Sequence, residues 1–436
     1  MPTVIPIATK PTTENMKQQK TKAYHHIGKY GIALAATLGL CLNAQAAPTL
    51  PSIPSGTYNI TSYGASTGSA NNATAIQNAI NAAAAAGGGT VQIPSGTFLS
   101  GPITLKSKIN LNLASGATLK MLAYGTYPGS TAFIYGKNLN NVEISGSGTI
   151  DGQGSAWWSA YNANNSLARP IMVRIEGSTA VEITGIKLQN APTAHVSFAY
   201  LCDQVTVTGV TISTPSSSPN TDGFDTEGNN YLFNNCNIAC GDDNIAIGAG
   251  HNVSQYYVIQ NCKFGVGHGC SIGSYTTYGV NHITVTGCTF TGTTSGLRIK
   301  SARGRGGVVQ YLTYANITMS GVQYPIWLSE WYPSDPGNPT TAGSASVTST
   351  TPNYKHIVIQ NLTATGATSA RTIYGLPEQH VSDVTLDNVK ITATTGMGIY
   401  YADSIVFKNG SSITVSSGNP VTIYNATVSG ITTHNY

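Results

Sequence analysis

Charged side chains are scarce in this chain: Asp, Glu, Lys and Arg together account for 9% of its 436 residues. The formal charge of +4 arises within residues 1–46, where five lysines accompany a single glutamate, so the remainder is balanced. A broad basic face of the kind that binds nucleic acid is therefore not expected. No apolar run reaches the roughly 20 residues that span a bilayer, so we expect no membrane-embedded segment in the mature protein.

The first 46 residues have the pattern of an export signal. A lysine-rich stretch precedes an apolar run over residues 32–42, which is followed by the small-residue pattern Ala44-Gln45-Ala46. We expect a translation start at Met16, cleavage after Ala46 and a secreted, extracellular protein of residues 47–436. A membrane anchor is the alternative, but the apolar run is short for one.

Cysteine is also rare, and six of the seven cysteines lie beyond the export signal. An exported protein meets oxidising conditions, which permit disulfides without fixing their connectivity. The six lack the Cys-x-x-Cys pairs that zinc sites use, so a structural zinc site is not expected. They are Cys202, Cys236, Cys240, Cys262, Cys270 and Cys288.

The chain does contain a repeat of about 26 residues. Alternating apolar residues around a Gly or Asn recur along it, as in Val205-Thr-Val-Thr-Gly209-Val and Tyr257-Val-Ile-Gln-Asn261-Cys, at intervals of 24, 26, 26, 26, 29, 45 and 27 residues. Gly and Asn suit sharp bends because they adopt the left-handed backbone conformation most readily. This pattern predicts an all-β fold, a β-solenoid that forms one domain over residues 47–436. The Gly or Asn positions are Gly185, Gly209, Asn235, Asn261, Gly287, Asn316, Asn361 and Asn388.

Three further features fit a stack of coils. Cys236, Cys262 and Cys288 stand 26 residues apart, which predicts one internal column of packing residues, with any disulfide left to the other three cysteines. Residues 72–86 have helical spacing and end in three glycines, and they predict a short helix that caps the first coil. Residues 331–352 are rich in Pro, Ser, Thr and Gly and predict a long surface loop.

Carboxylates gather in one part of the repeat. Like charges are unfavourable at close range unless the protein uses them, yet five of the few carboxylates fall within 22 residues. Because the Asp242-Asp243 pair follows Asp222 by about one coil, these three should lie on adjacent coils, roughly 4.8 Å apart. The five are Asp222, Asp225, Glu227, Asp242 and Asp243.

The same spacing extends the cluster downstream. His268 follows Asp243 by 25 residues, and Arg298 follows His268 by 30. Lys300 shares a strand face with Arg298, because side chains two residues apart point the same way. This combination suits glycoside hydrolysis, in which one carboxyl protonates the leaving oxygen while another activates water or attacks the sugar. The two cations favour an anionic substrate.

Each motif has an ordinary structural explanation when it is taken alone. Asn220-Thr221-Asp222-Gly223 is typical of a turn, and Gly241-Asp242-Asp243 of a calcium loop or a solvated bend. Gly267-His268-Gly269 is typical of a tight turn, and Arg298-Ile299-Lys300 of an exposed strand face. Their order, at about one coil each, favours a shared site instead.

The motifs Asn-Thr-Asp, Gly-Asp-Asp, Gly-His-Gly and Arg-Ile-Lys resemble, in the same order, those of glycoside hydrolase family 28, the polygalacturonases, and the resemblance covers most of residues 47–436. It implies a right-handed parallel β-helix that hydrolyses the α-1,4-galacturonosyl bonds of polygalacturonate or pectin with inversion and without a metal or other cofactor. It further implies that Asp242 is the general acid, that Asp222 and Asp243 hold the attacking water, and that His268 tunes the acid.

The resemblance also implies which residues bind the substrate. Arg298 and Lys300 would bind a galacturonate carboxylate, Tyr332 would contact the sugar, and Asn220 would support the geometry of its motif. The chain departs from many members at Asn244, where they have a cysteine, and at Cys270, where they have an aliphatic residue. The family's disulfides are therefore not transferred. Residues 247–250 depart as well, so subsite preference stays open.

Several activities remain open on this scaffold. We expect a monomer. We also expect that it cuts within the polymer, because the chain has one long insertion and no extra N-terminal domain. An exo-polygalacturonase and a rhamnogalacturonan or xylogalacturonan hydrolase are alternatives of the same class. A calcium-dependent pectate lyase and a non-catalytic β-solenoid adhesin are alternatives of other classes.

Overall fold

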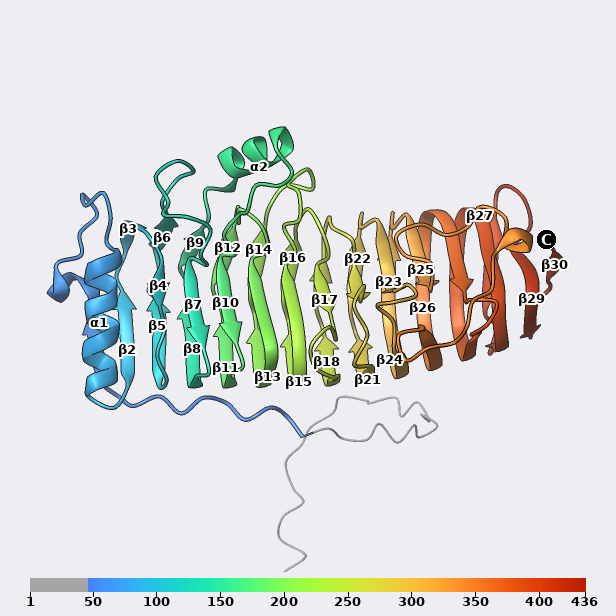
Figure 1. Ribbon diagram of the computed structural model, residues 1–436, viewed down its shortest axis with the longest axis horizontal. Coiled ribbons are helices and arrows are strands. Elements are labelled where there is room, and N and C mark those ends of the chain that lie inside the picture. The colour runs from blue at the N-terminus through green and yellow to red at the C-terminus, as the bar shows by residue number, and fades with distance from the viewer. Residues whose placement is uncertain (1–45) are drawn as a thin grey trace, which may run out of the picture. The chain divides into compact units, whose positions relative to one another are not determined.

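The structure is a computed structural model that describes residues 46–436, so the predicted export signal lies outside the described residues except for Ala46. The described chain winds into a stack of coils, and the strands of successive coils pair in parallel (Figure 1). This confirms the predicted all-β parallel β-helix. None of the helices in residues 46–436 has the length and apolarity that a bilayer span requires.

The strands form three columns that run along the stack. The first column contains β4 (Ile103–Thr104), β7 (Ile134–Lys137), β10 (Val173–Glu176), β13 (Val196–Thr208), β15 (Phe224–Asn234), β17 (Ile245–Ile247), β20 (Cys270–Ile272), β23 (Ser295–Lys300) and β25 (Tyr324–Ser329). The second contains β1 (Thr57–Asn59), β2 (Gly89–Ile93), β5 (Ile109–Leu113), β8 (Asn140–Gly146), β11 (Thr179–Thr184), β18 (Ser254–Gln260), β21 (Val280–Thr286) and β24 (Val308–Ser320), and β13 and β15 continue into it.

The third column is made of short strands, and the last coils use long ones. The third column contains β3 (Gly96–Ser100), β6 (Ala117–Met121), β9 (Thr149–Asp151), β12 (Lys187–Gln189), β14 (Thr211–Ser213), β16 (Asn237–Ala239), β19 (Lys263–Phe264), β22 (Thr289–Thr291) and β28 (Ser412–Val415). The last coils are built from β26 (Asn353–Tyr374), β27 (Val381–Lys408), β29 (Val421–Ser429) and β30 (His434–Asn435).

The Gly and Asn positions of the repeat make the predicted bends. All eight have φ between 51° and 73°, in the left-handed region. The asparagines also join neighbouring coils, because the Asn388 side chain donates to Asn361 Oδ1 at 3.0 Å and Asn361 donates to Asn316 Oδ1 at 3.1 Å. The repeat therefore reflects both a backbone requirement and a ladder of side-chain hydrogen bonds.

Apolar side chains stack inside the coils in columns. Cys236, Cys262 and Cys288 are buried and occupy successive coils, as predicted. Tyr231 and Tyr257 stack with ring centroids 4.4 Å apart. All six cysteines of the described residues are buried and free, so no disulfide joins the coils in this part of the chain.

The N-terminal cap forms nearly as predicted. Helix α1 (Ala73–Ala85) buries Ile76 and Ile80 against the first coil. Asn72 precedes it, but its side chain bonds Ser66 N and Leu99 O instead of the helix, and Asn71 Oδ1 accepts from Ala73 N at 2.9 Å. The remaining short element at this end is the 3-10 helix η1 (Ile60–Tyr63).

Two features lie outside the coils. Residues 331–352 form the predicted loop, in which the only helix or strand is the 3-10 helix η2 (Pro339–Thr341). Helix α2 (Gly154–Ala163), which the sequence did not predict, stands above the ends of the strands (Figure 1). Its buried face is small and centres on Trp157, so it lacks the long apolar stripe by which a helix is predicted.

Candidate active site

Successive strands of the first column bring the predicted residues together. Asp222, Asp243 and His268 each stand two residues before a strand, namely β15, β17 and β20, which pair in this order. Backbone hydrogen bonds join the three turns, because Gly223 N donates to Asp243 O at 2.9 Å and His268 N donates to Asp242 O at 2.8 Å. The aspartates therefore lie on adjacent coils, as predicted.

Asp243 is buried and pairs with both cations of the Arg-Ile-Lys motif. Its carboxylate lies 2.7 Å from Lys300 Nζ and 3.3 Å from Arg298 NH1. Ser271 donates its hydroxyl to Asp243 Oδ1 at 2.7 Å. Arg298 and Lys300 belong to β23, which pairs with β20, so the next coils supply these cations. The carboxylate of Asp243 therefore faces two positive charges and a hydroxyl donor.

Asp242 pairs with His268. Nδ1 of His268 lies 2.8 Å from Asp242 Oδ1, and the side chain of Asn220 donates to Asp242 Oδ2 at 3.5 Å. Burial acts to raise the pKa of Asp242, but the hydrogen bond from His268 and the charges of His268 and Lys300 outweigh burial and lower this pKa below its usual value.

The carboxyls with raised pKa values are on β15 and the turn before it. Burial, with the negative charges of Asp225, Asp242 and Asp243, raises the pKa of Asp222 well above its usual range. Burial and the charges of Asp243 and Asp242 raise the pKa of Asp225 to about 7. Asp242, the predicted acid, is thus the carboxyl of lowered pKa, and His268 is its hydrogen-bond partner.

Tyr332 lies beside the cations, as the sequence predicted for a substrate contact. Its ring centroid is 5.5 Å from Lys300 Nζ, and its backbone N–H donates to Ser301 O at 2.8 Å. All eight predicted site residues thus gather around one stretch of the first column. Their chemical roles remain predictions.

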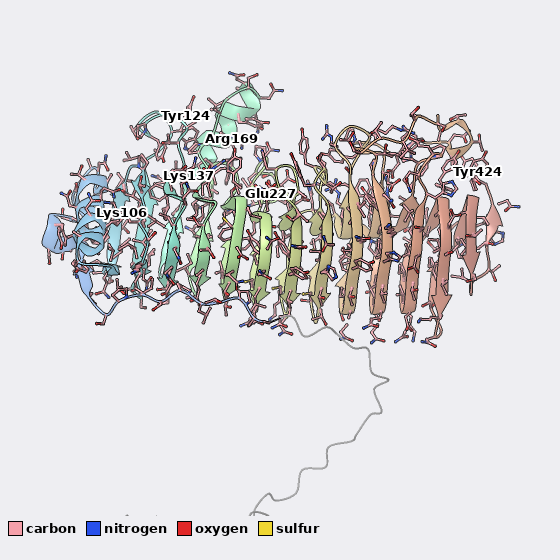
Figure 2. All side chains as sticks on the ribbon, turned by 60° about the horizontal axis from the view of Figure 1, so that its bottom comes forward. Lys106, Tyr124, Lys137, Arg169, Glu227 and Tyr424 are labelled. Carbon is pink, nitrogen blue, oxygen red and sulfur yellow. The ribbon has the colours of Figure 1, made fainter. Side chains whose placement is uncertain are left out.

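Two residues that support the site were not predicted. Arg169, next to α2 (Figure 2), donates to the carbonyls of Pro192 and Pro219 and to Asn220 Oδ1, at 2.6 to 2.8 Å. Its guanidinium stacks on Tyr161 of α2 with a separation of 3.7 Å. Arg169 therefore positions Asn220, the amide that contacts Asp242.

The second is His195, which is fully buried. Its Nδ1 lies 2.9 Å from Asp222 O, and its Nε2 lies 2.7 Å from Thr214 Oγ1. Because the carbonyl can only accept, Nδ1 carries the hydrogen and Nε2 accepts from the hydroxyl. Burial lowers the pKa of His195 to about 4, so the ring is neutral and fixes the backbone of Asp222.

Asn244, one of the departures from the resemblance, has a structural role. Its buried side chain accepts a hydrogen bond from Gly269 N at 2.8 Å and donates to Ile238 O at 2.8 Å. A Cβ at Gly267, where φ is 142°, would lie 2.5 Å from Asn244 Oδ1. The amide therefore holds the turn that carries His268, and only glycine fits against it.

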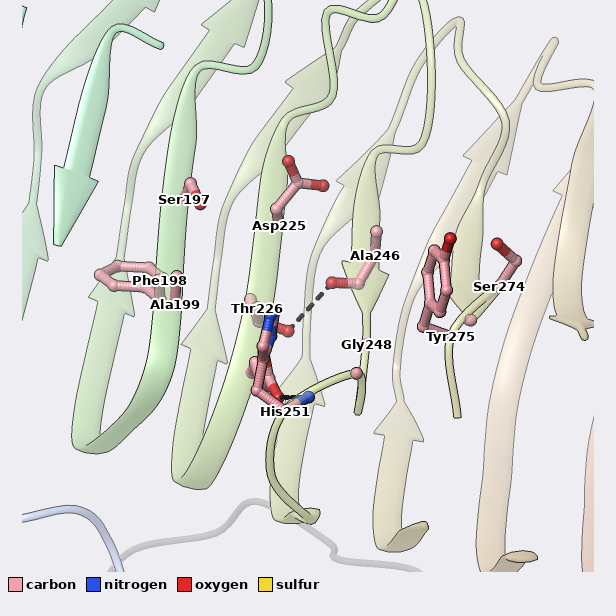
Figure 3. A pocket seen from close by; sticks show the side chains of 13 residues that line it. Ser197, Phe198, Ala199, Asp225, Thr226, Ala246, Gly248, His251, Ser274 and Tyr275 are labelled. Atoms are coloured by element: carbon pink, nitrogen blue, oxygen red, sulfur yellow. Dashed lines mark hydrogen bonds and ion pairs between the residues drawn. The ribbon is translucent and has the colours of Figure 1, made fainter. Parts of the chain in front are cut away.

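A groove of about 500 Å³ opens beside the carboxylates (Figure 3). Asp225 lies on one side of it, and Ser274 and Tyr275 lie on the other, with Ala246 between them. Glu227 also lines the groove. Glu227 is held in place because its carboxylate accepts from the backbone N–H groups of His251 and Asn252. The sequence placed Asp225 in the carboxylate cluster but did not single it out as a site residue.

Within residues 46–436, one group of side chains has atoms close enough to hold a metal ion: Asp242, Asp243 and His268, whose ligand atoms lie within 4.8 Å of one another. The carboxylate of Asp243 already faces Arg298 and Lys300. An ion would have to compete with these two cations, so the donor set does not fit a metal well.

Comparison with known proteins identifies the family. The model of "Glycosyl hydrolases family 28" matches residues 85–406. An endo-polygalacturonase of Pectobacterium carotovorum subsp. carotovorum is 33% identical over 329 residues, which are 69% of this chain and 78% of the relative. An exopolygalacturonase of Platanus acerifolia is 32% identical over 290 residues, 63% of this chain and 75% of the relative. The solved polygalacturonase of Erwinia carotovora ssp. carotovora has a TM-score of 0.69 and 30% identity and covers 84% of this chain and 99% of its own. The chain therefore belongs to glycosyl hydrolase family 28.

Proposed function

We propose that this glycoside hydrolase cleaves α-1,4-galacturonosyl bonds within polygalacturonate, with inversion at the sugar. The observation that carries the proposal is the pairing of Asp243 with Arg298 and Lys300 beside the other two aspartates. A hydrolase of neutral sugars has no need of two cations at its carboxylates, whereas a uronate substrate brings a negative charge that they can bind. The similar polygalacturonases support this substrate.

The proposed reaction divides the work among the paired groups. Asp242, which is hydrogen-bonded to His268, passes a proton to the leaving oxygen. Asp222 and Asp243 hold the attacking water, and Asp243, which faces Arg298 and Lys300, accepts its proton. Arg298 and Lys300 can exchange part of their contact with Asp243 for the carboxylate of the sugar. Tyr332 lies against Lys300 and forms the neighbouring surface.

Product sizes test the substrate and the mode of action together. Purified protein is incubated with de-esterified polygalacturonate at mildly acidic pH, and products are sized over time. Internal cleavage gives a rapid fall in viscosity and a series of oligomers, whereas release of monomer from the start would replace the endo proposal by an exo one. Both modes occur among the similar proteins. No new reducing ends would overturn the proposed function.

The same incubation distinguishes the alternative classes. A lyase would create unsaturated ends that absorb ultraviolet light and would lose activity with a chelator, whereas the proposed hydrolysis gives reducing ends alone and tolerates the chelator. An adhesin would bind polymer without cutting it. Rhamnogalacturonan and xylogalacturonan, offered in parallel, test the other specificities of the family scaffold.

We also propose that the enzyme is exported and acts as a monomer outside the cell. The proposal rests on the basic, apolar and small-residue pattern of residues 1–46. N-terminal sequencing of protein recovered from the culture medium should give a chain that begins at Ala47. Recovery only in the cell pellet, with the first residues intact, would contradict export. Size-exclusion chromatography checks the monomer.

A further inference from the structure

Arg305 is a cation at the groove that lacks a carboxylate partner. Among the six arginines of residues 46–436, Arg174, Arg298, Arg303 and Arg371 form ion pairs. Arg169 forms no ion pair, but its guanidinium donates hydrogen bonds to two backbone carbonyls and to the side chain of Asn220. Arg305 makes a single side-chain hydrogen bond within this part of the chain, from NH1 to Ser274 Oγ at 3.1 Å.

Two tyrosines orient this guanidinium. Its central carbon lies 4.9 Å from the ring centroid of Tyr275 and 5.8 Å from that of Tyr332. Stacking of this kind fixes the plane of the guanidinium while leaving its N–H groups available. The arrangement therefore presents an oriented donor with unused hydrogen-bonding capacity.

Arg305 also extends the row of substrate-facing cations. Lys300 Nζ lies 5.5 Å from the same Tyr332 ring that Arg305 contacts. Ser274 and Tyr275, which touch Arg305, line the groove opposite Asp225 (Figure 3). Arg305 is therefore linked through Tyr332 to Lys300 and through Tyr275 to the groove.

We propose that Arg305 forms a second carboxylate-binding subsite, which takes the uronate unit next to the one held by Arg298 and Lys300, on the side away from the bond that is cut. The inference rests on the proposed function and specifies its substrate: an oligomer with free carboxylates on consecutive units. The groove of about 500 Å³ is of the size that holds a small-molecule ligand. Because a guanidinium is charged and planar, it can donate two parallel hydrogen bonds to one carboxylate. Tyr275 is 56% exposed, and its ring centroid lies 4.9 Å from the central carbon of the guanidinium, so this ring can pack on the sugar.

The test compares Arg305→Gln and Arg305→Lys with wild type on polygalacturonate and on galacturonate oligomers of increasing length. Arg305→Gln loses one charge-assisted contact, and each ~1.4 kcal/mol lost is about tenfold in affinity. We therefore expect its KM to rise about tenfold while kcat stays within a few fold of wild type. Arg305→Lys should recover part of the lost affinity. Lys263→Gln, an exposed residue of β19, is the control for a lost positive charge. Thermal unfolding checks that each variant folds.

Oligomer length separates a subsite from an indirect effect. The KM penalty should be present for long oligomers and absent for the shortest oligomer that wild type cuts, because that one cannot reach Arg305. Methyl esterification of the substrate should reduce the difference between wild type and variant. A penalty of equal size at every length, or none at any length, would overturn the inference while the enzyme still cuts polygalacturonate. A wild type that cuts nothing overturns the proposed function instead.

Discussion

His268 and Asp242 are joined by a hydrogen bond of 2.8 Å between Nδ1 and Oδ1, at the point where two neighbouring coils meet. The carboxyl of this pair has a pKa below its usual value. A carboxyl in this state is a poor acid in the free enzyme. It becomes an effective one if the approach of the substrate raises this pKa.

Replacement of Asp242 by Asn removes the acid and leaves its shape. We expect kcat to fall by about 10²- to 10⁴-fold, the usual contribution of a positioned general acid, with KM changed little because the cations remain. Steady-state kinetics on polygalacturonate measure this. Asp403→Asn, which changes an exposed carboxylate on β27, serves as the control. A variant that keeps a tenth of the activity would remove Asp242 from its proposed role.

Lys300→Met should destabilise the fold as well as weaken substrate binding. Asp243 is almost fully buried, and removal of one partner of a buried ion pair typically costs about 3–5 kcal/mol of the free energy of unfolding. Because Arg298 and Ser271 still contact Asp243, we expect a cost at the lower end of this range. Urea unfolding at neutral pH gives the free energy of unfolding. The double variant Lys300→Met with Asp243→Asn should lose less than the sum of the two single variants, and simple additivity would contradict the coupling.

Asp225 should make stability depend on pH. Its pKa is about 7 in the folded protein and lower in the unfolded chain, so the folded state binds this proton more tightly. The resulting stabilisation is complete at about pH 4 or below and is lost as the pH rises through about 7. Asp222 acts in the same direction. We therefore expect Asp225→Asn to raise the Tm more at about pH 8 than at about pH 4, and an equal change at both would refute the assignment.

Asn244→Ala should loosen the turn that carries His268. The substitution leaves Gly269 N without its partner, which typically costs about 1–3 kcal/mol, whereas the carbonyls of Ile238 and Val266 keep a backbone donor each. We also expect kcat to fall, because the imidazole is less well placed. The free energy of unfolding and kcat are both measured. Asn237→Ala, on the exposed face of β16, is the matched control. Unchanged kcat in a destabilised Asn244→Ala would show that the turn keeps its geometry without the amide.

The stack of coils could be predicted because the same residue pattern recurs at a regular interval along the chain. Gly and Asn recur at the bends, and Asp222 and Asp243 are one coil apart in the sequence. In a parallel solenoid, residues one coil apart lie next to each other in space. His195 carries the same signal, since it precedes Asp222 by 27 residues and contacts its carbonyl. It could have been found by extending the spacing upstream of the aspartates.

Other features could not be predicted from the period. Arg169 reaches Asn220 across 51 residues through a segment that includes the helix α2 and does not follow the repeat. Which carboxyl retains a proton was also out of reach, because burial and the nearest cation decide it, and both depend on side-chain positions. Spacing predicted three aspartates together, but it could not predict that Asp222 and Asp242 differ in pKa.

The six enclosed cysteines bear on how this enzyme can be produced. Burial raises the pKa of the Cys202 thiol to about 11, so it carries almost no reactive thiolate near neutrality. With every thiol of residues 46–436 free and inside the stack, assembly of the coils requires no oxidant and no disulfide isomerase. A recombinant chain of residues 47–436 should consequently mature equally well in a reducing cytosol and in an oxidising periplasm, and alkylating reagents should label it only after it unfolds.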